Sequence, residues 1–171
     1  MRILMLNGSP RRNGNTAAFA NAFKESAEEK GNIVEIENLA SMTYGPCRAC
    51  NYCQNAGKGK CIQKDDAAEV IDNLSNWDMI VFASPVYYWG LSGQMQAFIS
   101  RFYPYGPIPV KKFALILSSA SEDVYKGIVS QYHDIVAYSN GESLGEFCFN
   151  GNDQKTPANL NKIKEFAISL E

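Results

Sequence analysis

The first residues that indicate a chemistry form a polar loop directly after a short apolar run. Ile3 to Leu6 are apolar, and Asn7 to Thr16 then read Asn-Gly-Ser-Pro-Arg-Arg-Asn-Gly-Asn-Thr. Backbone N–H groups and hydroxyls in such a loop converge on an anion when a helix begins directly after it. The loop has neither a Walker A sequence nor a GxGxxG spacing. We therefore predict a strand, a phosphate-binding loop and a helix; the alternative is an ordinary strand–helix turn with a good helix cap.

Four cysteines are packed into one short segment. Cys47, Cys50 and Cys53 form a CxxCxxC pattern, and Cys61 follows after seven residues. Four thiolates this close together can bind one metal centre, and their spacing resembles the ligand run of a [4Fe–4S] cluster. Two alternatives stay open, which are ordinary reduced thiols and a structural zinc ion, although all-cysteine zinc sites prefer two CxxC pairs. The fifth cysteine, Cys148, lies in an apolar run, and we expect it to be a buried small side chain with no ligand role.

A third group of residues is aromatic. Tyr87, Tyr88 and Trp89 are adjacent and are followed by Gly90. Aromatic side chains next to a phosphate site suit a flat, redox-active ring, and a glycine lets the backbone come close to it. Packing or an oligomer contact is the alternative, because Tyr and Trp are common in both. The phosphate loop and these aromatic residues together indicate a phosphorylated aromatic cofactor.

The elements that position these groups alternate between strands and helices. Short apolar runs predict five strands, at residues 3–6, 34–39, 79–84, 113–117 and 147–149. Apolar residues recur with a helical period in five further segments, around residues 19–27, 67–74, 91–102, 124–136 and 160–170. This alternation predicts one α/β domain over residues 1–171, a doubly wound five-stranded parallel sheet in the order 2-1-3-4-5 with helices on both faces. A Cys-rich loop is expected at about residues 45–64. Ligands of such sheets bind beyond the carboxyl ends of strands 1 and 3, where the polar loop and the aromatic residues follow.

Composition and charge exclude several classes of partner. The 171 residues carry a net charge of −2 without a basic face, which argues against nucleic acid. No apolar run approaches the roughly 18 residues that cross a bilayer, so we expect no membrane segment and a cytoplasmic protein. His133 is the only histidine, and we assign it no catalytic role. The pair Asp65 and Asp66 is interpreted as a helix cap rather than an acid–base couple, with Asp66 and Glu69 at capping-box spacing.

Two of these motifs resemble those of a known family. GSPRRNGNT after the first strand and SPVYYWGLSGQMQAFISR after the third are similar to the flavodoxin-like, FMN-binding NAD(P)H-dependent oxidoreductases, in particular the iron-sulfur flavoprotein branch. The resemblance extends from Met1 to about Leu117. It implies that the FMN phosphate is held by Ser9, Arg11, Asn15 and Thr16. It further implies that the ribityl chain and the ring lie along Pro85, Val86, Tyr87, Tyr88, Trp89 and Gly90, and that the ring is flanked on its other side by Ser118, Ser119 and Ser121. Gln96 and Ser100 depart from the family, which usually has Lys and Asp there, before the retained Arg101.

By this resemblance we expect an FMN-dependent oxidoreductase that passes electrons from NAD(P)H through bound FMN to a small-molecule acceptor such as a quinone. No catalytic side chain is needed, because the flavin carries the chemistry. The alternative is an iron-sulfur flavoprotein that carries electrons between FMN, a [4Fe–4S] cluster at Cys47, Cys50, Cys53 and Cys61, and a partner redox protein. A third hypothesis is a metal-stabilised binding module without flavin. The resemblance also implies a homodimer or homotetramer.

Overall fold

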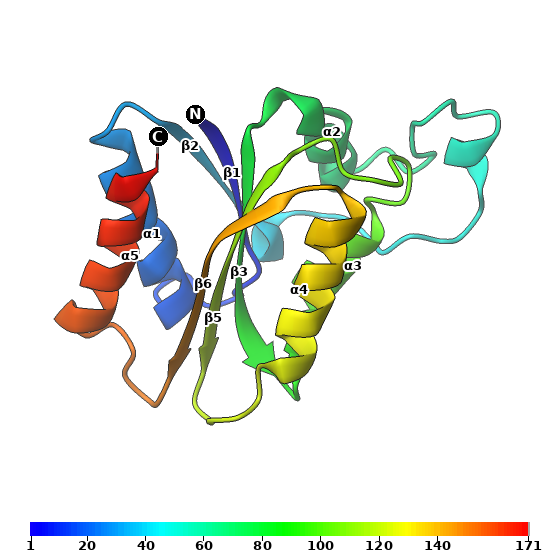
Figure 1. Ribbon diagram of the computed structural model, residues 1–171. Helices are drawn as coiled ribbons and strands as arrows, with labels where there is room; N and C mark the ends of the chain where they lie inside the picture. Colours follow the sequence, from blue (N-terminus) through cyan, green and yellow to red (C-terminus); the bar gives the residue numbers. More distant parts are fainter. Residues whose placement is uncertain (171) are drawn as a thin grey trace.

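The computed structural model describes residues 1–170 and shows a parallel sheet between two layers of helices (Figure 1). The five parallel strands are β1 (Arg2–Asn7), β2 (Ile33–Asn38), β3 (Met79–Tyr87), β5 (Lys112–Ser119) and β6 (Glu142–Asn150). They lie side by side in the order β2-β1-β3-β5-β6. A two-residue strand, β4 (Gly90–Leu91), pairs antiparallel with the end of β3 and stands outside this series. The predicted doubly wound order 2-1-3-4-5 is therefore confirmed for the parallel strands.

The helices cover both faces of the sheet, as predicted. One face carries α1 (Asn15–Glu28) and α5 (Pro157–Ser169), and the other carries α2 (Asp66–Asp72), α3 (Gly93–Ser100) and α4 (Lys126–Tyr138) (Figure 1). Single turns of 3-10 helix occur at Leu39–Ser41 (η1), Tyr52–Gln54 (η2) and Leu74–Asn76 (η3). No helix within residues 1–170 is both long and apolar enough to span a bilayer.

The central strands are buried on both faces, which explains their continuous apolar runs. In β1, Ile3 and Met5 pack in the layer of α1 and α5, whereas Leu4 and Leu6 pack in the layer of α2, α3 and α4. The same alternation recurs along β3. Because successive strand residues point to opposite faces, one uninterrupted apolar run serves two cores.

Two local predictions are wrong. The residue that caps α2 is Asp65 and not Asp66, because the Asp65 carboxylate accepts a hydrogen bond from the N–H of Ala68 at 3.1 Å. Cys148 is exposed and not buried. Phe147 and Phe149 pack toward α1 and α5, so the two-residue period of β6 turns Cys148 to the opposite face of this edge strand.

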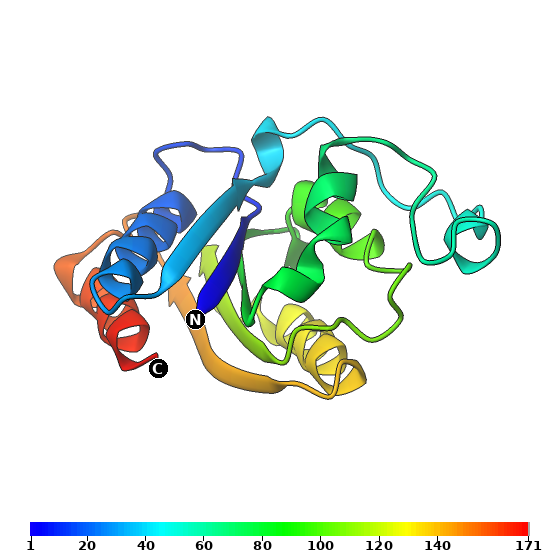
Figure 2. The same cartoon turned by 90° about the horizontal axis from the view of Figure 1, so that it is seen from above.

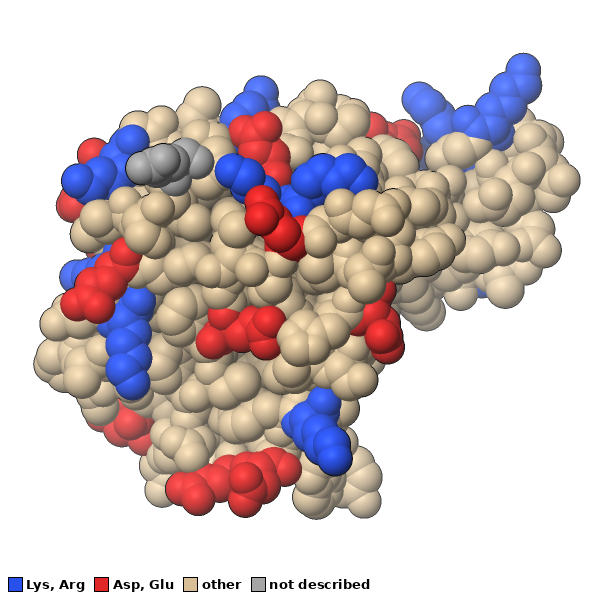
Figure 3. All heavy atoms as spheres, in the orientation of Figure 1, with Lys and Arg blue, Asp and Glu red and all other residues tan. Residues whose placement is uncertain are grey.

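The segment between η1 and α2 projects from the body of the protein. Figures 1 and 2 show it as a long cyan-to-teal loop that extends beyond α2 and α3 and includes the predicted Cys-rich loop, residues 45–64. Residues 42–64 contain four basic and no acidic residues, and Lys and Arg side chains mark this projection in the space-filling view (Figure 3). Long loops without regular structure are uncommon in compact domains and are usually functional.

Candidate functional site

The loop after β1 turns tightly against the neighbouring elements. The N–H of Gly8 donates to the carbonyl of Ala83 in β3 at 2.8 Å, which joins the ends of the two strands. A Cβ atom on Gly8 would lie 2.6 Å from the Oγ of Ser92 and 3.0 Å from the Cβ of Met95. Only a glycine therefore lets the loop leave the sheet at this point without displacing the start of α3.

The same loop leaves the N-terminus of α1 open. The Ser9 Oγ accepts a hydrogen bond from the N–H of Arg11 at 3.2 Å, and the Asn7 Oδ1 accepts one from the N–H of Ser9 at 3.0 Å. These side chains therefore pair with backbone N–H groups of the loop and not with those of α1. The residue that caps α1 is Gly14, which has no side-chain acceptor. The first N–H groups of a 14-residue helix are thus left for another partner, and such a helix end favours an anion.

A cavity of about 340 Å³ lies beside this helix end. It is bounded by the loop after β1, the start of α1, the carboxyl ends of β3 and β5, and the loops that follow β5 and β6, all at the carboxyl edge of the sheet. Ten of the predicted site residues line it: Ser9, Arg11, Asn15, Thr16, Pro85, Val86, Tyr87, Ser118, Ser119 and Ser121. The Thr16 Oγ1 lies 2.8 Å from the Ser118 Oγ, and this buried hydrogen bond joins α1 to the end of β5.

Tyr88, Trp89 and Gly90 do not line the cavity. Tyr87 pairs with Gly90 in the β3–β4 hairpin, so Tyr88 and Trp89 form a two-residue turn with positive φ angles of 51° and 62°. Such turns usually contain Asn and Gly, and two aromatic residues there strain the backbone. Their side chains are 94% and 64% exposed and contact each other edge to face. Tyr88 and Trp89 therefore form an aromatic tip next to the cavity wall that Tyr87 contributes.

Five further residues line the cavity: Gly14 and Ala120 lie within segments that the sequence had indicated, and Gly151, Asn152 and Gln154 were missed. The three that were missed belong to the loop after β6. The signal was present in the topology, because the carboxyl end of β6 lies at the same edge of the sheet as those of β1, β3 and β5. His133, by contrast, lies on α4 outside this lining, with its Nε2 2.8 Å from the Glu146 Oε1.

Two other hollows are larger than this cavity but do not suit a phosphate. One, of about 530 Å³ around Tyr103 and Tyr138, has no charged side chain in its lining. The other, of about 490 Å³, is lined by acidic residues that include Glu35, Glu37 and Glu69. Burial and the neighbouring Glu35 raise the pKa of Glu37, as expected where carboxylates crowd together. The electrostatics therefore favour the cavity at α1 for an anionic ligand.

The four cysteines of the projecting loop line one small cavity together with Arg101. Cys53 is buried, Cys50 is exposed, and Cys47 and Cys61 are half-buried. Among residues 1–170, no three His, Cys, Asp or Glu side chains lie close enough together to hold a single metal ion. A cluster of four irons takes one thiolate per iron and so spreads its ligands further apart. The four thiols are the donor set that such a cluster takes. The loop must widen to admit it, because the cavity of about 20 Å³ has room for no more than one water molecule.

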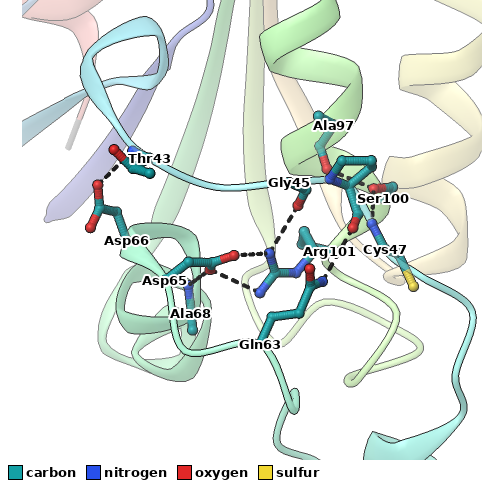
Figure 4. A network of polar contacts seen from close by, with 11 residues as sticks. Thr43, Gly45, Cys47, Gln63, Asp65, Asp66, Ala68, Ala97, Ser100 and Arg101 are labelled. Carbon is teal, nitrogen blue, oxygen red and sulfur yellow. Dashed lines mark hydrogen bonds and ion pairs between the residues drawn. The ribbon is translucent and has the colours of Figure 1, made fainter.

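Arg101 ties the cysteine loop to the rest of the protein (Figure 4). Its guanidinium forms two hydrogen bonds with the Asp65 carboxylate, at 2.7 and 3.0 Å, and donates a third to the carbonyl of Gly45 at 2.9 Å. Burial raises the pKa of Asp65, but the hydrogen bonds and charge of Arg101 outweigh it, so the pKa lies below its ordinary value. Burial likewise lowers the pKa of Arg101, and Asp65 together with the nearby Cys61 more than reverses this.

The two positions that depart from the resembled family also have partners here. Ser100 accepts a hydrogen bond from the N–H of Cys47 at 3.0 Å and donates to the carbonyl of Ala97, so it fastens the first cysteine to α3 (Figure 4). Gln96 and Gln131 form a reciprocal pair of side-chain hydrogen bonds at 3.1 and 3.0 Å, which links α3 to α4.

Comparison with known proteins decides the family. A model of the NADPH-dependent FMN reductases matches residues 1–155. The chain belongs to this family. It is 34% identical over 140 residues to an iron-sulfur flavoprotein of Archaeoglobus fulgidus, which covers 82% of this chain and 61% of the relative. An iron-sulfur flavoprotein of Methanocaldococcus jannaschii is 34% identical over 104 residues, which covers 61% of this chain and 53% of the relative. The chain thus spans little more than half the length of these curated relatives.

Solved structures confirm the flavodoxin-like fold of this FMN reductase family member. The NAD(P)H:quinone oxidoreductase from Methanothermobacter marburgensis superposes with a TM-score of 0.78 at 17% identity and covers 100% of this chain and 99% of that one. The azoreductase from Bacillus anthracis superposes with a TM-score of 0.77 at 15% identity and covers 99% of this chain and 100% of that one. The resemblance inferred from the two loop motifs is therefore confirmed.

Proposed function

We propose that this chain is an FMN-dependent oxidoreductase that passes electrons from NAD(P)H through bound FMN to a small-molecule acceptor such as a quinone. One observation carries the proposal: in a chain of the FMN reductase family, a single cavity joins the open N-terminus of α1 to the carboxyl end of β3 and to the end of β5 with the loop that follows it. The donors at the helix end fit a phosphate group, and the wall formed by Tyr87 fits a flat ring.

The residues of the cavity have separate roles in this proposal. Ser9, Arg11, Asn15 and Thr16 bind the phosphate at the end of α1. Pro85, Val86 and Tyr87 orient the ribityl chain and the ring, with Tyr88, Trp89 and Gly90 at the rim and with Ser118, Ser119 and Ser121 on the opposite side. When bound, FMN supplies the redox chemistry, so we assign no side chain as a general acid or base.

Flavin binding and turnover test this proposal. We expect apo-protein to bind FMN far more tightly than riboflavin, because only FMN carries the phosphate that meets the helix end. The FMN-loaded protein should oxidise NADH or NADPH when 1,4-benzoquinone is supplied. Equal affinity for FMN and riboflavin would contradict the phosphate-binding role of this helix end. FMN-loaded protein that oxidises neither NADH nor NADPH would contradict the reductase function.

A second candidate is an iron-sulfur flavoprotein that exchanges electrons between FMN, a [4Fe–4S] cluster and a partner redox protein. It is favoured by the four cysteines that line one cavity beside the buried Arg101, and by the loop around them, whose charged residues are all basic. An anionic cluster suits both. The names of the curated relatives agree with it. In this candidate, Cys47, Cys50, Cys53 and Cys61 are the cluster ligands.

Metal analysis of anaerobically purified protein separates the two candidates. About four irons and four sulfides per chain support the carrier, and stoichiometric FMN without iron excludes it. If the four cysteines are cluster ligands, Cys50→Ser should lose iron. FMN should stay bound in this variant, because the flavin cavity is built from other elements. The matched control is Cys148→Ser, which changes an exposed cysteine outside the loop and should keep both.

We also propose that residues 1–171 form one flavin-binding domain and that it assembles into a homodimer or homotetramer in the cytoplasm. The exposed aromatic tip of Tyr88 and Trp89 supports an assembly, because such side chains are enriched at interfaces. Sedimentation that shows only monomer at micromolar concentration would contradict it.

A further inference from the structure

Two exposed aromatic features lie at opposite ends of α3 and α4. The aromatic tip, Tyr88 and Trp89, stands at the carboxyl edge of the sheet, where both helices begin (Figure 1). The uncharged hollow of about 530 Å³ lies where both helices end, and it is lined by Tyr103 and Tyr138, which are 49% and 64% exposed. The Gln96–Gln131 pair joins the two helices midway. One face of the protein therefore carries the tip at one end and the hollow at the other.

The outer side of α4 carries a stripe of opposite charges between these two ends. Lys126, Ser130 and Asp134 are four residues apart, so they lie on one side of the helix, and all three are exposed. Neither Lys126 nor Asp134 forms an ion pair within residues 1–170. The other ionisable residue of α4, His133, pairs with Glu146 of β6, and α3 has no charged residue. The two charges of the stripe are thus free for a partner.

This stripe is complementary to a second copy of itself. Lys126 and Asp134 are equally far from Ser130, about 6 Å along the helix at the usual rise per residue. If two copies of α4 pack antiparallel about a two-fold axis at Ser130, Lys126 of each copy lies opposite Asp134 of the other. The same rotation brings the start of each helix to the end of its counterpart. The tip of each copy then meets the hollow of the other.

The tip and the hollow also suit each other chemically. The two-residue turn holds the rings of Tyr88 and Trp89 away from the protein's own core, so they remain 94% and 64% exposed. The hollow offers aromatic walls and no charged side chain. Trp and Tyr side chains that enter a desolvated pocket of the partner contribute most of the binding energy at many interfaces.

We propose that the α3–α4 face is a two-fold interface between two copies of this chain, in which the tip of each copy enters the hollow of the other and Lys126 pairs with Asp134 across the axis. This inference rests on the assembly proposed above and names its surface. Because the same patch serves both copies, the contact closes as a dimer. In a tetramer it is one of the interfaces.

Charge reversal tests the axis. Dissociation constants are measured by sedimentation for wild type, Lys126→Asp, Asp134→Lys and the double variant. Each single reversal replaces two attractive contacts by two repulsive ones, and we expect it to weaken the dimer about tenfold. The double variant restores both pairs and should return to within about threefold of wild type. Lys164→Asp, an equal reversal at an exposed position of α5, is the matched control and should have no effect.

Truncation of the aromatic residues tests the ends of the interface. We expect Trp89→Ser and Tyr138→Ser each to weaken the dimer about a hundredfold, since each residue occurs twice in the contact. Tyr52→Ser, which removes an exposed tyrosine of the cysteine loop outside the hollow, is the matched control. If wild type is a tetramer, the same variants should separate it into dimers.

The inference is overturned if wild type is a monomer at micromolar concentration, which would leave the face to a different protein. It is also overturned if the double reversal does not restore the association, or if the truncations act no more strongly than Tyr52→Ser. Wild type that assembles as described but neither binds FMN nor oxidises NAD(P)H would refute the flavin function alone. Active protein that stays monomeric would refute the interface alone.

Discussion

The proposed flavin cavity gathers residues that are distant in the sequence, whereas the cysteine loop is one continuous segment, and the two regions are held in place in different ways. The cavity lies at the ends of β1, β3, β5 and β6, whose positions follow from the hydrogen-bond ladders of the sheet. The loop has no strand. It is fastened by side chains, above all by Arg101 to Gly45 and by Ser100 to Cys47.

Because of this difference, the two regions should respond differently to amino-acid substitutions. A site built on strand ends inherits the stability of the whole sheet, and its residues can change one at a time with local effects. A loop fastened by a few side-chain contacts depends on each of them, and removing either partner of the partly buried Arg101–Asp65 ion pair leaves a charge without compensation. We therefore expect changes at the fastening residues to act on stability and changes in the cavity to act on flavin affinity.

The largest expected effect is at Arg101. Its side chain is 1% exposed, and Arg101→Met removes two hydrogen bonds and the opposite charge from the Asp65 carboxylate and one hydrogen bond from the Gly45 carbonyl. The free energy of unfolding should fall by about 3 kcal/mol, measured by urea denaturation. Arg48→Met is the matched control, because Arg48 is an exposed arginine of the same loop and should change stability by less than about 0.5 kcal/mol. Similar losses in both variants would refute the role assigned to the ion pair.

A smaller loss is expected where the phosphate loop meets α3. Gly8→Ala places a Cβ 2.6 Å from the Ser92 Oγ, so the loop or the helix must shift, at a cost of about 2 kcal/mol in the free energy of unfolding. Gly93→Ala is the control, because nothing lies within 4 Å of a Cβ there. If Gly8→Ala is as stable as the control, the close approach of the loop does not constrain the site.

Within the cavity, Thr16→Ala should reduce the free energy of FMN binding by about 1 to 2 kcal/mol, the contribution of a hydrogen bond to a charged group. The Thr16 hydroxyl is paired with that of Ser118, which holds it at the end of α1. Ser169→Ala, at the far end of α5, serves as the control. Titration of apo-protein with FMN measures both; a large loss of folding stability without loss of affinity would reverse the contrast between the two regions.

The mildest probe is pH. The pKa of Asp65 lies below its ordinary value of 3.8 because of Arg101, so the ion pair stabilises the fold above that pH and is lost as the pH falls through the lowered pKa. Asp65→Asn keeps a capping side chain but removes the charge. Wild type should be the more stable protein near neutral pH, and the difference should shrink below pH 3.8. Urea midpoints across this range decide it; a constant difference would show that the charge of Asp65 is not involved.

Sequence patterns that extend over a few residues were sufficient to predict much of the fold and part of the candidate site. The alternation of apolar runs and helical periods predicts the parallel strands and their order, and the family resemblance implies ten of the residues that line the cavity at the start of α1. The prediction for Cys148 failed because an apolar run does not show which face of an edge strand is covered. The capping residue of α2 was misplaced by one position, because two adjacent aspartates offer the same signal.

The sequence by itself determined the flavodoxin-like sheet and the family, because these depend on short motifs and on the two-residue and 3.6-residue periods. Only the tertiary structure decided that Gln154 reaches the cavity, that Tyr88 and Trp89 turn away from its lining, and that Arg101 pairs with Asp65. Each of these contacts joins residues from separate elements. Their distance and orientation follow from how whole elements pack, and no local pattern encodes that.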